Sequence, residues 1–249
     1  RVLMSGGGTA GHIYPALTVA ARLVADGHEV AFVGTPDGLE ARLVPEAGIR
    51  FVGVRAAGFD RGNPLTLITS TVRVLLSALS AGRLIGEYRP DVVLGFGGYV
   101  SLPVGLAAAL RRVPLVLHEQ NSVPGLANRV LSRWARAVGV TYEESLRHLA
   151  HPERAVVTGN PVREAVLAAE RDRGRQAFGL AADAVVLLVF GGSRGARHIN
   201  DTLVTLAPEL VAMPSLQVLH SAGTIEAASV ASRVAEALDG DLSRYHVVD

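Results

Sequence analysis

A histidine follows a run of three glycines close to the start of the chain. An apolar run leads into Gly6, Gly7 and Gly8, and a helical pattern begins at about residue 12. A strand that passes through glycines into a helix is typical of phosphate binding, because the backbone can approach an anion and the N–H groups of the helix start point at it. His12 lies at that helix start, where a protonated imidazole is disfavoured. We therefore expect a neutral His12 that can accept a proton near pH 7, with a purely structural histidine as the alternative.

The same order of strand, glycines and helix occurs twice more. Residues 92–99 precede a helical pattern at 100–110, and residues 185–195 precede one at 196–206. Three such corners predict a protein that holds phosphates at more than one place. The first corner also matches Gly-x-Gly-x-x-Gly, but the second predicted strand ends without the early acidic residue that would bind ribose hydroxyls. A nicotinamide-dependent oxidoreductase is therefore poorly supported by these residues.

Polar residues also end the fifth predicted strand, at His118 and Glu119. Polar groups at the carboxyl ends of parallel strands line the ligand crevice of open α/β sheets. Glu119 could act in catalysis or as a buried hydrogen-bond anchor, and both interpretations stay open. No third ligand accompanies the pair, so we expect no metal site. Arg163, which follows a turn-rich segment, could pair with a phosphate or a carboxylate, or could lie at the surface.

The elements that must position these residues alternate between apolar runs and amphipathic segments, which predicts a doubly wound α/β protein with parallel sheets. The predicted strands of the first series are 2–4, 29–33, 50–54, 91–95, 114–118, 136–140 and 154–158, and those of the second are 184–190, 216–220 and 245–248. The helical patterns of the first series are 12–26, 38–47, 64–88, 100–111, 124–133 and 143–149. We expect domains at 1–160 and 161–249, and the second, with only about 90 residues, is smaller than a usual domain and is expected to be incomplete.

Composition narrows the classes of protein. Among the 249 residues, 49% are hydrophobic, 5% aromatic and 19% charged, with a net charge of +1. This balance suits parallel strands buried on both faces and gives no global field for nucleic acid, which we do not expect as a partner. The absence of cysteine excludes disulfides, thiolate catalysis and Cys-bound zinc. No Walker-type motif is present, so P-loop enzymes are also excluded.

The helical pattern at 64–88 carries apolar residues most of the way round, more than one buried face requires. One interpretation is a core helix packed on the sheet. The other is a partly exposed apolar surface flanked by Arg73 and Arg83, as on a peripheral membrane protein. The candidate patch consists of Leu65, Ile68, Val72, Leu75, Leu76 and Leu79.

Taken together, six segments resemble the MurG family, whose members transfer N-acetylglucosamine from UDP-N-acetylglucosamine to lipid I, the undecaprenyl-diphosphate-linked muramyl peptide. The matching segments are 7–16, 95–101, 118–121, 124–128, 158–163 and 190–196. Two residues depart from the family pattern. Ala10 stands where many members have glycine, and Arg194 stands where glutamine is common. The family's second domain also normally continues well beyond Asp249.

The resemblance implies a GT-B fold with two Rossmann-like domains. It assigns the acceptor's diphosphate to the first and second glycine loops and the donor's diphosphate to the third. Implied acceptor contacts are Gly8, Gly11, His12, Gly97, Gly98 and Tyr99, and implied donor contacts are Thr9, Ala10, Gly11, Asn121, Arg163 and Ser193. The helix at 64–88 falls where the family's membrane-facing patch is expected, which favours the exposed interpretation. The implied location is peripheral, at the cytoplasmic face of the bacterial plasma membrane, against an anionic surface.

The implied reaction is inverting transfer that forms lipid II in peptidoglycan synthesis, and through it serves cell shape and cell division. It requires no cofactor and no metal. His12 would be the general base for the acceptor's 4-hydroxyl, while helix N-termini and Arg163 would stabilise the departing UDP. Two alternatives remain, namely another GT-B glycosyltransferase with a different acceptor and a non-catalytic UDP-sugar-binding fragment.

Overall fold

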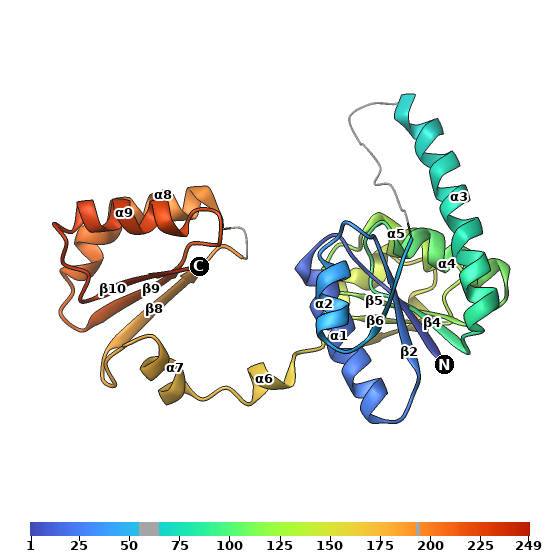
Figure 1. Cartoon of the computed structure of the whole chain (residues 1–249), viewed down its shortest axis with the longest axis horizontal. Helices are drawn as coiled ribbons and strands as arrows, with labels where there is room; N and C mark the ends of the chain where they lie inside the picture. The colour runs from blue at the N-terminus through green and yellow to red at the C-terminus, as the bar shows by residue number, and fades with distance from the viewer. Residues whose placement is uncertain (55–64, 193–194) are drawn as a thin grey trace. The chain divides into compact units, whose positions relative to one another are not determined.

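The computed structural model describes residues 1–54, 65–192 and 195–249, except for the side chains of residues 65–75. The chain divides into two compact units, Arg1–Leu167 and Ala168–Asp249 (Figure 1). This division falls a few residues after the boundary expected at 160/161. Each unit is described by itself.

The first unit is built on a seven-stranded parallel sheet with the order β3-β2-β1-β4-β5-β6-β7. Its strands are β1 (Val2–Ser5), β2 (Val30–Gly34), β3 (Arg50–Gly53), β4 (Val92–Gly95), β5 (Leu115–Glu119), β6 (Ala137–Val140) and β7 (Ala155–Val157). Each lies within or beside its predicted segment. The chain runs outward from β1 to β3 and then returns to add β4 on the other side of β1. Ligands of open α/β sheets bind at such a switch point, beyond the carboxyl ends of the two central strands.

Helices cover both faces of this sheet. The α-helices of the first unit are α1 (Ala10–Ala25), α2 (Glu40–Glu46), α3 (Leu65–Tyr88), α4 (Ser101–Leu110), α5 (Leu126–Leu131) and α6 (Glu164–Leu167). Residues of α1 and α2 pack with Met4 and Phe32 on one face, whereas α3, α4 and α5 pack with Leu3 and Val93 on the other. Successive residues of one strand therefore point into the cores on opposite faces of the sheet. Because both faces are buried, the sequence of such a strand is a nearly continuous apolar run.

One predicted helix has a different form. The segment expected at 143–149 is the 3₁₀ helix η1 (Glu143–His148), which precedes a second short one, η2 (Pro152–Arg154). Extended residues bound η1 on both sides, and the buried hydroxyl of Ser145 donates to Asn121 O at 2.9 Å. This hydrogen bond to a neighbouring loop fixes the position of η1, which is too short to be stabilised much by α-helical hydrogen bonds of its own.

The helix α3 combines both interpretations that its sequence allowed. Ala81, Ile85 and Tyr88 lie in the core, whereas Leu76 is 58% exposed and Leu79 is 67% exposed. The other residues of the expected patch lie outside the described side chains, and these are Leu65, Ile68, Val72 and Leu75. Within the part of the chain that the structure describes, no helix is both long and apolar enough to cross a membrane.

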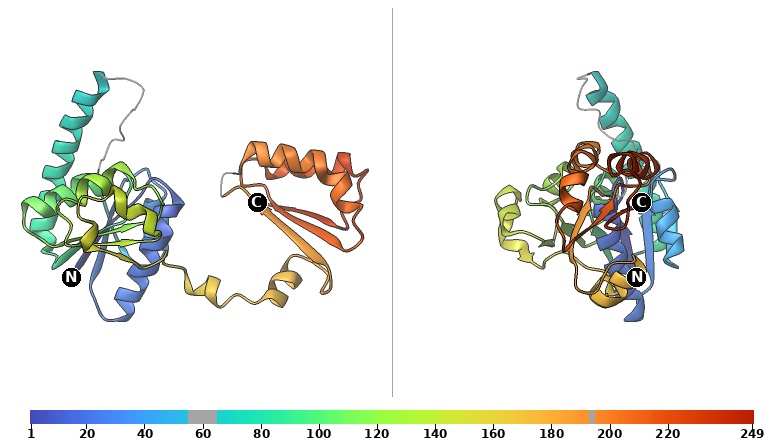
Figure 2. Two further views of the ribbon diagram at one scale, coloured as in Figure 1. Left: turned by 180° about the vertical axis from the view of Figure 1, so that it is seen from behind. Right: turned by 90° about the vertical axis from the view of Figure 1, so that its left-hand side faces the viewer.

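The second unit has a three-stranded parallel sheet with the order β10-β9-β8. Its elements are α7 (Arg171–Ala177), β8 (Val185–Phe190), α8 (Arg197–Val211), β9 (Leu216–Ser221), α9 (Ala227–Ala237) and β10 (Tyr245–Val248). Both α8 and α9 lie on one face of the sheet (Figure 2), where Leu203 and Val234 pack with Val218 and Tyr245. The third glycine corner joins β8 to α8, as expected, but Ser193 and Arg194 lie outside the described residues.

Candidate functional site

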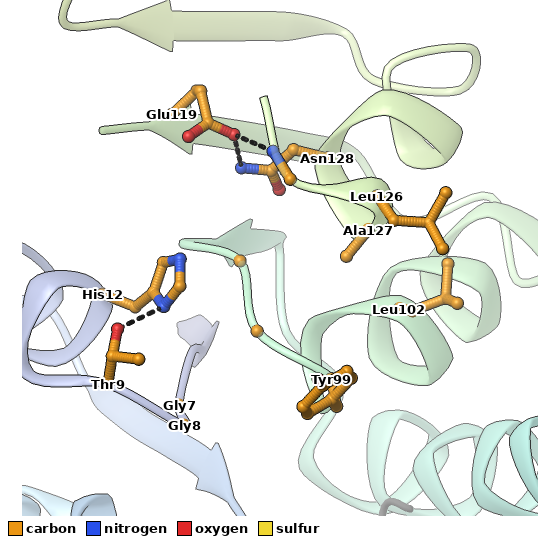
Figure 3. A pocket seen from close by; sticks show the side chains of 13 residues that line it. Gly7, Gly8, Thr9, His12, Tyr99, Leu102, Glu119, Leu126, Ala127 and Asn128 are labelled. Carbon is orange, nitrogen blue, oxygen red and sulfur yellow. Dashed lines mark hydrogen bonds between the residues drawn. The ribbon is translucent and has the colours of Figure 1, made fainter. Parts of the chain in front are cut away.

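A cavity of about 380 Å³ opens at the switch point of the first unit, beyond the ends of β1, β4 and β5 (Figure 3). Three connections line it, and each follows one of these strands. The lining residues are Gly7, Gly8, Thr9 and His12 from the first glycine loop, Gly97, Gly98, Tyr99 and Leu102 from the second, and Glu119, Gly125, Leu126, Ala127 and Asn128 after β5. The structure therefore brings together two motifs that are about ninety residues apart in the chain.

The two glycine loops touch each other through their backbones. A Cβ on Gly98 would lie 2.3 Å from Gly7 O, and Gly98 has φ +81°, so only glycine fits there. Ser101 Oγ, which has one proton to donate, lies 2.7 Å from Gly97 O and 3.1 Å from Ser5 O and so links the second loop to the end of β1. The loops form one continuous wall of the cavity.

His12 lies on the first turn of α1 with its imidazole at the cavity. Its Nδ1 is 2.9 Å from Thr9 Oγ1, and its Nε2 lies on the side of Gly97 (Figure 3). Burial lowers the pKa of His12 below its usual value, against smaller raising effects of the nearby Glu119 carboxylate and the Gly7 backbone. The sequence also predicts a neutral His12, on the ground that it lies at a helix start. In the structure, desolvation by burial is the largest cause of the lowered pKa. If Nδ1–H donates to Thr9, Nε2 is free to accept a proton.

Glu119 is a hydrogen-bond anchor, one of the two roles that the sequence left open. It is 1% exposed and accepts four hydrogen bonds. Oε1 accepts from Asn121 N and Asn121 Nδ2, both at 2.9 Å, and Oε2 accepts from Gly125 N at 3.1 Å and Asn128 Nδ2 at 2.9 Å. One carboxylate therefore holds the whole turn between β5 and α5.

Asn128 completes this turn with a fixed amide. Its Nδ2 also donates to His118 O at 3.1 Å, which leaves Oδ1 buried and without a hydrogen-bond partner among the described residues. His118 itself bonds through Nε2 to Gly159 O at 3.1 Å, and burial lowers its pKa. His118 thus links the end of β5 to the turn that leads to Arg163.

Several expected site residues lie outside the cavity. The guanidinium of Arg163 stacks over the ring of Tyr14 at 4.4 Å from its centroid. Asn121 turns its amide toward Glu119, and Ala10 and Gly11 are not among the lining residues. No group of three or more His, Cys, Asp or Glu residues that could hold a metal ion occurs in the described ranges.

One buried acid beside the cavity is not predicted by the sequence. Glu40, at the start of α2, is fully buried, and its Oε2 lies 3.4 Å from Gly8 N. In the sequence it resembles any acidic residue in the first turn of a helix, which is usually solvated. The sequence feature that could have indicated the buried role of Glu40 is the set of glycines around it. A Cβ on Gly34, on Gly38 or on Gly7 of the first glycine loop would meet the Glu40 side chain.

Residues 2–140, more than half of the chain, match the sequence model of the glycosyltransferase family 28 N-terminal domain. The chain belongs to glycosyltransferase family 28. The matched segment contains all three connections that line the cavity, so the cavity lies within the part of this chain that matches the family 28 N-terminal domain.

Similar proteins agree with the resemblance drawn from the motifs. The chain is 42% identical over 225 residues to a protein of Desulfitobacterium hafniense strain Y51 named UDP-N-acetylglucosamine--N-acetylmuramyl-(pentapeptide) pyrophosphoryl-undecaprenol N-acetylglucosamine transferase, covering 90% of this chain and 61% of that protein. It is 38% identical over 244 residues to a protein of the same name from Thermoanaerobacter sp. strain X514, covering 97% of this chain and 66% of that one. The chain thus spans about three fifths of the length of such relatives.

A solved structure gives the same result for the fold. The crystal structure of Acinetobacter baumannii MurG superposes with a TM-score of 0.69 at 30% sequence identity, over 99% of this chain and 64% of that one. The expected resemblance to the MurG family and the expected GT-B class of two Rossmann-like units with parallel sheets are confirmed.

Proposed function

We propose that this chain provides the acceptor site and part of the donor site of an inverting N-acetylglucosaminyltransferase that converts lipid I to lipid II in peptidoglycan synthesis. The supporting observation is the cavity in which two glycine loops and a neutral His12 share one wall. The names of the relatives from Desulfitobacterium and Thermoanaerobacter supply the donor and the acceptor.

In this proposal the acceptor's diphosphate lies against the two touching loops. The contacts are Gly8, Gly11, His12, Gly97, Gly98 and Tyr99, of which all but Gly11 line the cavity. Gly8 has φ +82° and no atom within 4 Å of where a Cβ would be, so the backbone leaves open space for an anion. Tyr99 is 52% exposed and borders this space.

His12 then acts on the acceptor's 4-hydroxyl. Nδ1–H donates to Thr9 Oγ1, so that Nε2 takes the hydroxyl proton as the oxygen attacks the anomeric carbon of the donor sugar. UDP leaves from the opposite side, and the configuration inverts. The lowered pKa keeps the imidazole unprotonated at neutral pH, which is the state that a base requires.

The donor nucleotide is proposed to contact Thr9, Ala10, Gly11, Asn121, Arg163 and Ser193. Arg163 is the cationic group of this set, and it would stabilise the charge that develops on the diphosphate. Its stacking on Tyr14 holds the guanidinium beside α1. Neither a metal nor another cofactor has a role in this proposal.

The proposal also places the protein at the cytoplasmic face of the plasma membrane, bound peripherally through α3. Leu76 and Leu79 are one turn apart, and the exposed Arg83 follows at the next turn, so the three side chains share one face of the helix. Exposed leucines followed by an arginine suit insertion beside anionic headgroups.

The decisive experiment measures transfer of radiolabelled N-acetylglucosamine from UDP to a lipid I analogue. This chain and the full reading frame of its gene are tested in parallel, each with a His12→Ala variant. We expect transfer that requires His12 in at least one of the two polypeptides. If neither transfers sugar although UDP-N-acetylglucosamine binds, the acceptor assignment is wrong, and a different acceptor or a binding role replaces it.

A further inference from the structure

A buried carboxylate lies beneath the first glycine loop, and the proposed reaction does not use it. Glu40 has no solvent exposure. Its Oε1 accepts hydrogen bonds from Thr35 N at 2.8 Å and Thr35 Oγ1 at 2.7 Å, and its Oε2 accepts one from Gly8 N at 3.4 Å. Within the described part of the chain, no ion pair joins Glu40 to a cation. Burying an unpaired acid is unfavourable unless its hydrogen bonds compensate, so these three contacts account for its presence.

The space around Glu40 exists because three neighbours lack side chains. A Cβ on Gly7 or Gly38 would lie 2.4 Å from Oε1, and a Cβ on Gly34 would lie 2.3 Å from Cγ of Glu40. All three distances are far shorter than a van der Waals contact. Gly7 is therefore a glycine because a carboxylate packs against it from inside the protein, and this requirement is separate from any ligand.

The contact with Gly8 connects Glu40 to the cavity. Gly8 precedes Thr9, whose Oγ1 is 2.9 Å from His12 Nδ1, and all three residues line the cavity. We propose that Glu40 is a positioning residue, which holds the first glycine loop and through it the His12 imidazole in register with the acceptor. The inference rests on the proposed function. A displacement of about 1 Å at a reacting group can lower the rate by about 10²-fold, so a support that fixes Gly8 matters for turnover.

Replacing Glu40 by glutamine removes the charge of the side chain but keeps its shape. Thr35 presents two donors to Oε1, so the amide oxygen of a glutamine would stay on that side. Its NH2 group would then face Gly8 N–H, and two donors cannot bond to each other. Glu40→Gln therefore removes the loop contact while it keeps the volume of the side chain and the contacts with Thr35.

The matched control is Val44→Ala in the same helix. Val44 is fully buried in the core between α2 and the sheet and does not line the cavity. Its truncation destabilises α2 through packing, without removing a hydrogen bond to the loop. Both variants are assayed well below their melting temperatures, in the polypeptide that shows transfer.

For Glu40→Gln we expect kcat/KM for the lipid I analogue to fall about 10- to 100-fold. Val44→Ala should keep the wild-type kcat/KM. Amide hydrogen exchange supplies a second readout that does not depend on activity. The Gly8 amide should exchange at least about tenfold faster in Glu40→Gln and at the wild-type rate in Val44→Ala.

Two results would overturn the inference. One is a wild-type kcat/KM together with unchanged Gly8 exchange in Glu40→Gln. The other is an equal loss in both variants, which would make Glu40 an ordinary contributor to stability. If the wild-type polypeptide transfers no sugar, the proposed function fails separately, and exchange at Gly8 still decides whether Glu40 holds the loop.

Discussion

Removal of the Glu119 carboxylate tests how the cavity is built. Glu119→Ala leaves four donors without their acceptor, and these donors belong to Asn121, Gly125 and Asn128. Asn121 and Gly125 are exposed, so water can replace the carboxylate there, whereas Asn128 is 1% exposed. A net loss of about 0.5–1 kcal/mol for each of the three solvated contacts and about 1–3 kcal/mol for the buried one gives a total of about 2.5–6 kcal/mol. For a unit of this size, that corresponds to a fall in Tm of about 5–24 °C.

The single tryptophan makes the measurement specific for the first unit. Trp134 is the only tryptophan in the chain, it lies in the first unit, and it is 49% exposed. Urea unfolding followed by its fluorescence therefore reports on this unit and not on the second. Glu119→Gln, which keeps one acceptor oxygen, should lose roughly half as much stability as Glu119→Ala. A loss below about 1 kcal/mol in Glu119→Ala would refute the reasoning, because four contacts of this kind cannot be so nearly neutral together.

Three further predictions concern the site and the surface. His12→Ala should lower kcat about 10²–10⁴-fold and leave UDP binding within about twofold, as measured by single-turnover transfer and calorimetry. Burial lowers the pKa values of His12, His118 and His220, so the unfolded chain binds protons more readily than the folded one just below pH 6.5. Stability should therefore fall as the pH drops from about 7.5 to 5.5 in urea titrations, and the acid limb of kcat/KM should lie below about 6.5. Finally, replacing Leu76 and Leu79 together by Ser should weaken binding to anionic vesicles at least about tenfold in sedimentation, while a neutral-vesicle control changes less.

The framework of the first unit follows from local patterns. Its strands are mostly apolar runs of three to five residues, and most are separated by helices long enough for parallel crossovers. The ends of elements are less predictable. The 3₁₀ form of η1 depends on the hydrogen bond from Ser145 to Asn121, two residues that are 24 positions apart. A pattern of hydrophobic residues contains no information about such a contact.

The site was predictable wherever a residue type implies a function by itself. Glycine corners and a histidine at a helix start indicate the cavity, and the structure brings them together. Glu40 and the stacking of Tyr14 on Arg163 were not predictable, because both depend on tertiary contacts between segments that resemble ordinary helix and loop sequence. The same holds for Glu119, whose environment decides between anchor and catalyst.

The first glycine loop shows why such motifs need a structure for their interpretation. Its consecutive glycines suggest that the backbone must approach a phosphate at every position. In the structure, Gly7 makes room for the carboxylate of Glu40 and also contacts the backbone of Gly98, whereas the place of a Cβ on Gly8 is open space. In the proposed function, the close approach of a ligand therefore concerns Gly8, whereas the requirement for glycine at Gly7 and Gly98 comes from the packing of the protein against itself. The two loops pack backbone against backbone with no side chain between them, so the shape of this wall comes from the protein itself. The proposed function requires such preorganisation, because it places an acceptor diphosphate and a base at fixed positions.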